Sequence, residues 1–225
     1  MTPLYLYLLL GSLSVPMIFS IFFIDFVKNW RAFFLSTTII AAVFLLWDVI
    51  FTEKGIWGFE KTYCVGIHIL KMPIEEWLFF FIIPFCSLFT HFAFFYKFPS
   101  QKLNKQTTLI ITFVLILTCL VLLLVNYSKA YTLVNYSILL IVLSLGLLCN
   151  IQLLQKFYIS FLIIVVPFFI INGVLTGAVT EIPVVWYDNV ENLGIRLYTI
   201  PIEDIGYAFS MLFGNLMLFE KFNKK

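Results

Sequence analysis

A short acidic motif occurs twice in this sequence. Pro73-Ile74-Glu75-Glu76 in the first half returns as Pro201-Ile202-Glu203-Asp204 in the second, and each copy adjoins an apolar stretch in which a carboxylate is costly. When two carboxyl groups are held close together, one can stay protonated while the other is ionised. The first can then serve as an acid and the second as a base. We therefore predict a catalytic set of Glu75, Glu76, Glu203 and Asp204, without assigning which is acid and which is base. The alternative is that they cap helices, because a helix start favours negative charge.

The composition indicates that lipid surrounds the elements carrying these acids. Hydrophobic residues make up 62% of the chain and charged residues 12%, with a mean hydropathy of +1.04. A membrane-spanning helix needs roughly 20 mostly apolar residues. Segments that meet this need are 3–27, 32–51, 74–96, 107–125, 131–150, 157–178 and 201–219. The sequence thus predicts an all-α integral membrane protein with seven transmembrane helices.

The similarity between the two halves extends beyond the motif. Matched positions are Gly66-Ile67 with Gly194-Ile195, His68 with Arg196, Phe79 with Tyr207, Asp48 with Asn172, Thr52 with Thr176, and Trp57 with Trp186. The match predicts two three-helix repeats, residues 1–98 and 131–225, joined by a connector helix within 99–130. The connector helix crosses the membrane once more between the repeats, so both repeats have the same orientation. They should therefore be parallel and related by an axis along the membrane normal.

Polar and aromatic side chains near the motifs could complete a site. Asp48 and Asn172 fall at matched depths inside predicted spans, where polar groups usually face the protein interior, although Asn172 could equally make a helix-to-helix hydrogen bond. His68 and Arg196 precede the two motifs and are candidate partners of the acids, or else solvated loop charges. Aromatic rings attract cations, so we predict rings that stabilise a cationic substrate, although such rings also form interfacial belts. The predicted rings are Trp57, Trp77, Phe79, Phe80, Trp186 and Tyr207.

Charge in the loops predicts the orientation. Most of the 14 basic residues fall on one side of the predicted spans if the N-terminus is outside, which by the positive-inside rule places the C-terminus in the cytoplasm. We expect a multi-pass protein, with the bacterial inner membrane as its location. The basic residues on the predicted cytoplasmic side are Lys28, Arg31, Lys97, Lys102, Lys105, Lys156, Lys221, Lys224 and Lys225.

The motif and its flanks resemble the integral-membrane lycopene cyclases. The run from Trp47-Asp48 through Gly66-Ile67 to Pro73-Ile74-Glu75-Glu76-Trp77-Leu78-Phe79-Phe80 carries the likeness, and its repetition near the C-terminus is similar to the fused, two-repeat form of that family. The second copy departs from the pattern, with Asp204 for a glutamate and Ile205-Gly206 for Trp77-Leu78. That difference leaves open whether the two halves are equivalent in catalysis.

This resemblance implies a lycopene β-cyclase, an isomerase of the intramolecular lyase type. An acid would protonate a terminal double bond of lycopene, the neighbouring double bond would attack the tertiary cation, and a base would remove a proton. Repetition at the second end would give β-carotene with two β-ionone rings. The implied partners are a carotenoid dissolved in the bilayer and other enzymes of carotenoid synthesis. One or two rings, a β or an ε ring, carotenoid length and oligomeric state stay open.

No cofactor or metal is expected. No Gly-x-Gly-x-x-Gly fingerprint is present, and only Asp188 to Glu191 looks like a site for magnesium and diphosphate. A small transporter of a lipid or isoprenoid is the main alternative function, with Pro16 and Pro167 as hinges. A retinal protein is disfavoured because the last span has no lysine between Pro201 and Phe219.

Overall fold

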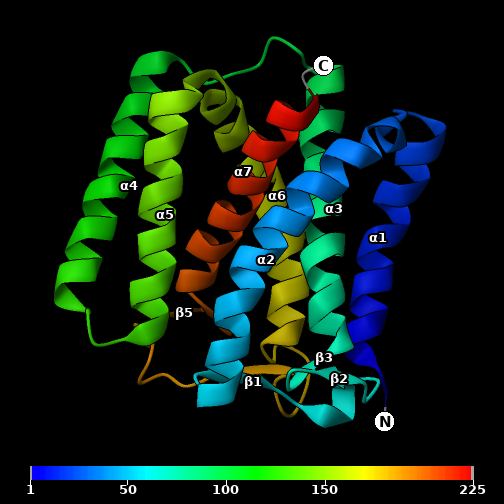
Figure 1. Ribbon diagram of the computed structural model, residues 1–225, viewed down its shortest axis with the longest axis vertical. Coiled ribbons are helices and arrows are strands. Elements are labelled where there is room, and N and C mark those ends of the chain that lie inside the picture. The colour runs from blue at the N-terminus through cyan, green and yellow to red at the C-terminus, as the bar shows by residue number, and fades with distance from the viewer. Residues whose placement is uncertain (1, 224–225) are drawn as a thin grey trace.

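The computed structural model describes residues 2–223, which contain seven α-helices running between two ends of the molecule (Figure 1). Lys224 and Lys225, two of the basic residues used to predict orientation, lie outside the described residues. The α-helices are α1 (Leu4–Phe22), α2 (Trp30–Lys54), α3 (Ile74–Lys97), α4 (Lys105–Val125), α5 (Ala130–Cys149), α6 (Ile151–Leu175) and α7 (Glu203–Asn223). Short 3-10 helices cover Phe26–Asn29 and Lys61–Tyr63.

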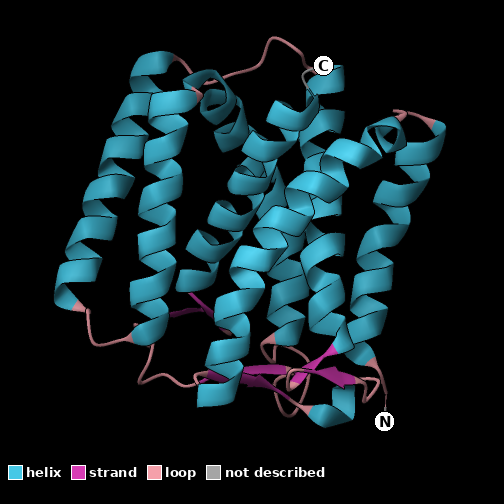
Figure 2. Cartoon of the chain, viewed as in Figure 1, coloured by secondary structure: helices cyan, strands magenta, loops and turns pink. Residues whose placement is uncertain are grey.

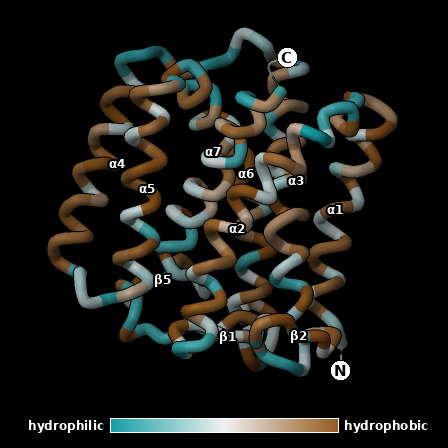
Figure 3. The backbone as a smooth tube through the Cα atoms, in the orientation of Figure 1, coloured by the Kyte–Doolittle hydropathy of each residue, from teal (hydrophilic) through white to brown (hydrophobic). Residues whose placement is uncertain are grey.

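Six of these helices are long and apolar enough to cross a bilayer, and hydrophobic residues follow them along most of their length (Figure 3). Helix α7 is less apolar and does not meet the same test, although it is as long as α4. Protein surrounds it, because Phe213, Leu216 and Phe219 have no exposed surface. The fold is therefore an all-α multi-pass membrane protein, with the seventh predicted span as its central helix.

The helices of the two halves interlock. Helix α1 packs along α3, and α5 packs along α7 in the same way. The middle helices cross over: α2 packs mainly against α7, whereas α6 packs more against α3 than against α7. Helix α4 lies on the outside against α5, as a connector would (Figure 1). Each acid-bearing helix is thus held by the first helix of its own half and the middle helix of the other.

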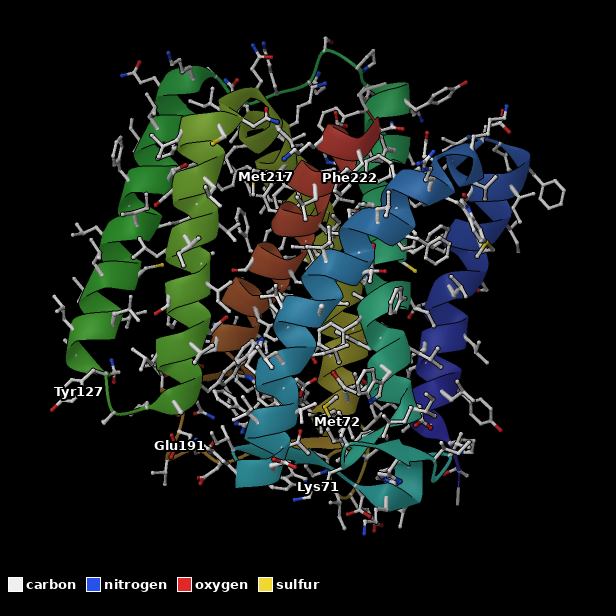
Figure 4. All side chains as sticks on the ribbon, viewed as in Figure 1. Lys71, Met72, Tyr127, Glu191, Met217 and Phe222 are labelled. Carbon is white, nitrogen blue, oxygen red and sulfur yellow. The ribbon has the colours of Figure 1, made fainter. Side chains whose placement is uncertain are left out.

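Short strands gather at one end of the bundle (Figure 2). Strand β1 (Trp57–Phe59) pairs antiparallel with β4 (Val185–Tyr187), which joins the two halves. The hairpins β2 (His68–Ile69) with β3 (Met72–Pro73), and β5 (Arg196–Leu197) with β6 (Ile200–Pro201), lie directly before α3 and α7. Figure 4 shows Lys71 and Glu191 at this end and Met217 and Phe222 at the other.

Several helix ends differ from the sequence expectation. Helix α7 begins at Glu203, two residues after the predicted start, because Pro201 belongs to strand β6. Helix α1 ends at Phe22 because the chain turns at Asp25, which has a left-handed φ of 55°. Helix α6 begins at Ile151, six residues before the predicted start, because the Asn150 side chain accepts a hydrogen bond from the Leu153 amide and caps it.

The strand end also corrects one pair in the repeat alignment. Glu60 donates its amide to the Val184 carbonyl, and Asp188 donates its amide to the Ile56 carbonyl. The sequence separation between Pro73 and Pro201 is also the separation between Glu60 and Asp188 and between Ile56 and Val184. The two hydrogen bonds are therefore equivalent in the two halves. With that offset Trp57 corresponds to Val185, not to Trp186, so the predicted match of the two tryptophans is wrong by one position.

Candidate active site

One small cavity lies between the two halves near the strand end, and three carboxyl groups face it. Its volume is about 50 Å³, and Asp48, Glu76 and Asp204 lie in its wall. These side chains come from α2, α3 and α7, and at most 9% of any of them is exposed. The other lining residues are Tyr5, Trp57, Phe59, Phe79, Tyr131, Phe168, Asn172, Leu175, Val185, Tyr187 and Tyr207.

On the first-half side, two carboxyl groups share few hydrogen-bond donors. The Tyr5 hydroxyl donates to Glu76 Oε2 at 2.5 Å. Trp57 Nε1 donates to Asp48 Oδ1 at 2.7 Å, whereas Asp48 Oδ2 is buried with no hydrogen-bond partner. Glu76 and Asp48 line the same small cavity. Two neighbouring buried carboxyls with so few donors are costly to ionise together.

On the second-half side, three donors converge on a single carboxylate. The Tyr131 hydroxyl donates to Asp204 Oδ1, while Asn172 Nδ2 and the Tyr187 hydroxyl donate to Oδ2 at 2.8 and 3.1 Å. Tyr187 lies in β4, and burial together with the charge of Asp204 raises its pKa above the ordinary range of tyrosine. The Tyr187 hydroxyl therefore stays protonated at neutral pH. Three donated bonds favour the charged form of Asp204.

The other acid of each motif points away from this cavity. Glu75 Oε1 accepts the Val65 amide at 2.6 Å, and Glu203 Oε1 accepts the Leu193 amide at 2.7 Å. Thr132 adds a bond to Glu203 at 2.9 Å. Both side chains are fully buried and tie the preceding loop to the first helical turn. The structure thus brings together one acid of each motif and not the other.

A family comparison bears on this arrangement. The model of the lycopene cyclase family matches the chain over residues 2–95 and again over 128–222. The chain belongs to the lycopene cyclase family. No curated protein and no solved structure matches it. The family makes the protein an enzyme of carotenoid cyclisation, and its apolar helices fit a substrate dissolved in lipid.

The predicted aromatic residues of this lycopene cyclase divide into two groups. Trp57, Phe79 and Tyr207 line the cavity. Phe80 is buried beside Phe79 but outside the cavity, and Trp77 Nε1 donates to the Ile69 carbonyl at the surface. Trp186 is 40% exposed and covers the outer face of β1.

The two basic candidates do not contact the acids. His68 is exposed, with Nδ1 3.1 Å from the Gly66 carbonyl oxygen. Arg196 donates to the Thr199 carbonyl and to Asn189 Oδ1, and its guanidinium lies over the Tyr187 ring, 5.8 Å from the centroid. Neither is among the ion pairs formed within residues 2–223. The prediction that these two partner the acids is therefore wrong in this structure.

The sequence analysis predicted Tyr207 but missed the tyrosines that donate hydrogen bonds to the acids, although the repeat carries a signal for them. Tyr5 and Tyr131 both lie in the first turns of the first helix of a half, and each donates to its own half's carboxyl group. The corrected offset pairs Phe59 with Tyr187. Within the described residues, no group of three or more His, Cys, Asp or Glu side chains is placed to hold a metal ion.

Proposed function

We propose that this lycopene cyclase closes the acyclic ends of lycopene to β-ionone rings by acid and base catalysis in the cavity between its halves. The observation that carries the proposal is the convergence of Glu76, Asp48 and Asp204, which come from both halves, on one buried cavity. Aromatic rings surround these groups, and the cavity is reached from an apolar environment. The reaction needs a proton donor, a proton acceptor and the exclusion of water.

The hydrogen bonds support an assignment of roles. Glu76 and Asp48 lie together with few donors, so that one proton held between them lowers the cost of burial. Asp204 accepts three hydrogen bonds, which stabilise a carboxylate. We assign the acid to the Glu76 and Asp48 pair and the base to Asp204. Unequal environments that hold neighbouring carboxyls in different protonation states are a general way to obtain an acid and a base at one pH.

The chemical steps then balance without a redox partner. The acid gives its proton to the terminal double bond of lycopene, which leaves a tertiary cation. The electrons of the neighbouring internal double bond form the new carbon–carbon bond and move the positive charge into the ring. Asp204 removes a ring proton, and the electrons of that C–H bond become the ring double bond. One proton enters and one leaves for each ring, so the product is an isomer of the substrate.

The remaining wall suits a passing cation. Phe79 and Tyr207 occupy equivalent positions of the two halves, and Trp57 lies next to Asp48. A cation near an aromatic face gains about 2 kcal/mol or more when water is excluded. We propose that Glu75 and Glu203 are positioning residues, because each fixes the loop that precedes its acid-bearing helix.

The test uses neighbouring acids as a matched pair. Glu76→Gln and Glu75→Gln are each expressed in a bacterium that accumulates lycopene, and the extracted pigments are separated by chromatography against β- and ε-ring standards. We expect the parent to form β-carotene and Glu76→Gln to be slower by roughly 10²–10⁴-fold, the usual size of an acid or base contribution. Glu75→Gln should stay near the parent. Equal loss in both variants at equal membrane abundance would contradict the assigned site.

The orientation remains a proposal that can be checked separately. The positive-inside rule places the strand end and its cavity at the outer surface of a bacterial inner membrane. A reporter active only in the cytoplasm, fused after Lys225, should be active, whereas a reporter active only outside should be inactive. The opposite pattern would contradict this orientation. Pull-down of other carotenoid enzymes would test the predicted partners.

A further inference from the structure

A second cavity extends from the acid site into the membrane-spanning part of the bundle. Its volume is about 380 Å³, within the range of small-molecule sites. Helices α1 and α6 form its walls, and α3 and α7 form its floor. We call this cavity the α1/α6 groove.

The groove and the acid site are adjacent. Five residues line both: Phe79, Phe168, Asn172, Leu175 and Tyr207. The acid site alone, with a volume of about 50 Å³, is much smaller than the range of roughly 300–1,000 Å³ that is usual for small-molecule sites. A ring closing on the acids must therefore form at the junction, with the rest of its chain in the groove.

The groove offers an apolar lining although several hydroxyl residues border it. The Ser12 hydroxyl donates to the Leu8 carbonyl at 2.7 Å, and the Thr90 hydroxyl donates to the Cys86 carbonyl at 2.8 Å, so these groups are satisfied within their own helices. Each wall also carries a proline in its interior, Pro16 in α1 and Pro167 in α6. A helix proline removes one backbone hydrogen bond, so both walls are weakened beside the groove.

The equivalent approach through the other half is filled. There α2 and α5 replace α6 and α1, and Trp47 takes the place of the groove residue Ile171. Trp47 is buried and packs against Tyr207 and Tyr131, with ring centroids 5.4 and 6.1 Å apart. Farther along, Asn215 donates to the Thr37 hydroxyl at 2.9 Å and joins α7 to α2. Among the described residues, the groove between α1 and α6 thus offers space beside the acids where Trp47 fills the equivalent position of the other half.

From this asymmetry we infer that the α1/α6 groove binds the polyene arm of an acyclic carotenoid, which enters from the bilayer between α1 and α6. One end of the substrate reaches the acids at a time. The half-cyclised carotenoid leaves and returns with its other end foremost. This inference rests on the proposed cyclase function, and the occupant is argued from the lining residues that the groove shares with the acid site.

The binding test separates the groove from the chemistry. In purified Glu76→Gln protein, which keeps the groove but lacks the proposed acid, lycopene binding is measured by its visible absorption in detergent. Gly11→Trp is then added, because Gly11 lines the groove and no atom lies within 4 Å of a Cβ built there. Leu10→Trp is the control, because Leu10 is 50% exposed and does not line the groove.

We expect Gly11→Trp to weaken lycopene binding at least tenfold, and Leu10→Trp to leave it unchanged. Unchanged binding with Gly11→Trp, or equal loss in both variants, would overturn the groove assignment. If Glu76→Gln binds lycopene through the groove while the parent forms no ring, the proposed function fails and the groove assignment stands.

A time course tests the inference that one end of the substrate reaches the acids in each binding event. With lycopene in large excess over active parent enzyme, the monocyclic carotenoid should appear first and accumulate free in the membrane. Formation of the two-ring product from the earliest times, with no free monocyclic carotenoid, would overturn the inference that each end requires its own binding event.

Discussion

The two halves of the acid site share a backbone plan but differ in side-chain chemistry. Tyr5 and Tyr131 hold equivalent places, as do Glu76 and Asp204. The first half adds a second carboxyl group, Asp48, where the second half has an amide, Asn172. The second half adds the Tyr187 hydroxyl where the first has the Phe59 ring. The two halves thus share a geometry, and these differences in side chains support the proposal that one side holds a proton and the other accepts one.

The largest expected effect is that replacing Glu76 and replacing Asp204, the carboxyl groups that the two halves contribute to the cavity, should give different products. Glu76→Gln should leave most lycopene unchanged, with turnover lower by roughly 10²–10⁴-fold, because the cation forms much more slowly. Asp204→Asn should lose β-ring formation by roughly 10²–10⁴-fold, yet form traces of rings that lost a different proton, because the acid remains. Chromatography with mass spectrometry distinguishes these outcomes. Traces of altered rings from Glu76→Gln and none from Asp204→Asn would reverse the assigned roles.

Making the first half resemble the second tests the carboxyl pair. Asp48→Asn removes the group that we propose shares a proton with Glu76, and we expect turnover to fall by about 10- to 100-fold. Pigment formation per unit of membrane-bound protein measures it. The matched variant is Asn172→Asp, which places two carboxyls on the base side and should also slow the reaction. Full activity of Asp48→Asn would remove Asp48 from the proposal.

A smaller change makes the second half resemble the first. Tyr187→Phe deletes one of three hydrogen bonds to Asp204, and a bond to a charged group is worth about 1.5–3 kcal/mol. We expect turnover to fall by about tenfold or somewhat more, with the fold retained. Initial rates in isolated membranes provide the measurement. Phe59→Tyr is the control, because it adds a hydroxyl on the other side; a greater loss there than in Tyr187→Phe would contradict the assigned base.

The smallest effect is expected from a variant that changes the stability of the fold. A Cβ at Gly58 would lie 2.4 Å from the Trp186 ring, so Gly58→Ala should destabilise the fold by about 1–3 kcal/mol. Thermal unfolding in detergent, followed by helical circular dichroism, measures the change. Trp186→Ala in the same background should recover part of the loss. No recovery would show that the tryptophan does not shield β1 in the way described.

The sequence predicted the helices well because apolar length is a local property. It also located Glu76, Asp204, Asp48 and Asn172, because the duplicated motif marks them. It could not distinguish the role of Glu76 from that of Glu75, because the two residues are adjacent and differ only in where their side chains point. The direction of the Glu75 side chain depends on its hydrogen bond with the loop amide of Val65.

Other features of the site depend on contacts distant in sequence. The Tyr5 bond to Glu76 joins α1 to α3, and the Tyr187 bond to Asp204 needs β4 to pair with β1. The error at Trp57 arose because two tryptophans were matched by residue type, although the loops that carry them differ in sequence. The strand register corrected it.

The position of α7 has a consequence for biogenesis. Among the seven described helices it follows the other six in the chain, it is less apolar than the helices that qualify as spans, and it lies between α2 and α5. Until α7 packs into the bundle, the Tyr131 hydroxyl lacks Asp204, the carboxylate that receives its hydrogen bond. The cavity between the halves is therefore complete only when α7 has packed against helices that precede it in the chain.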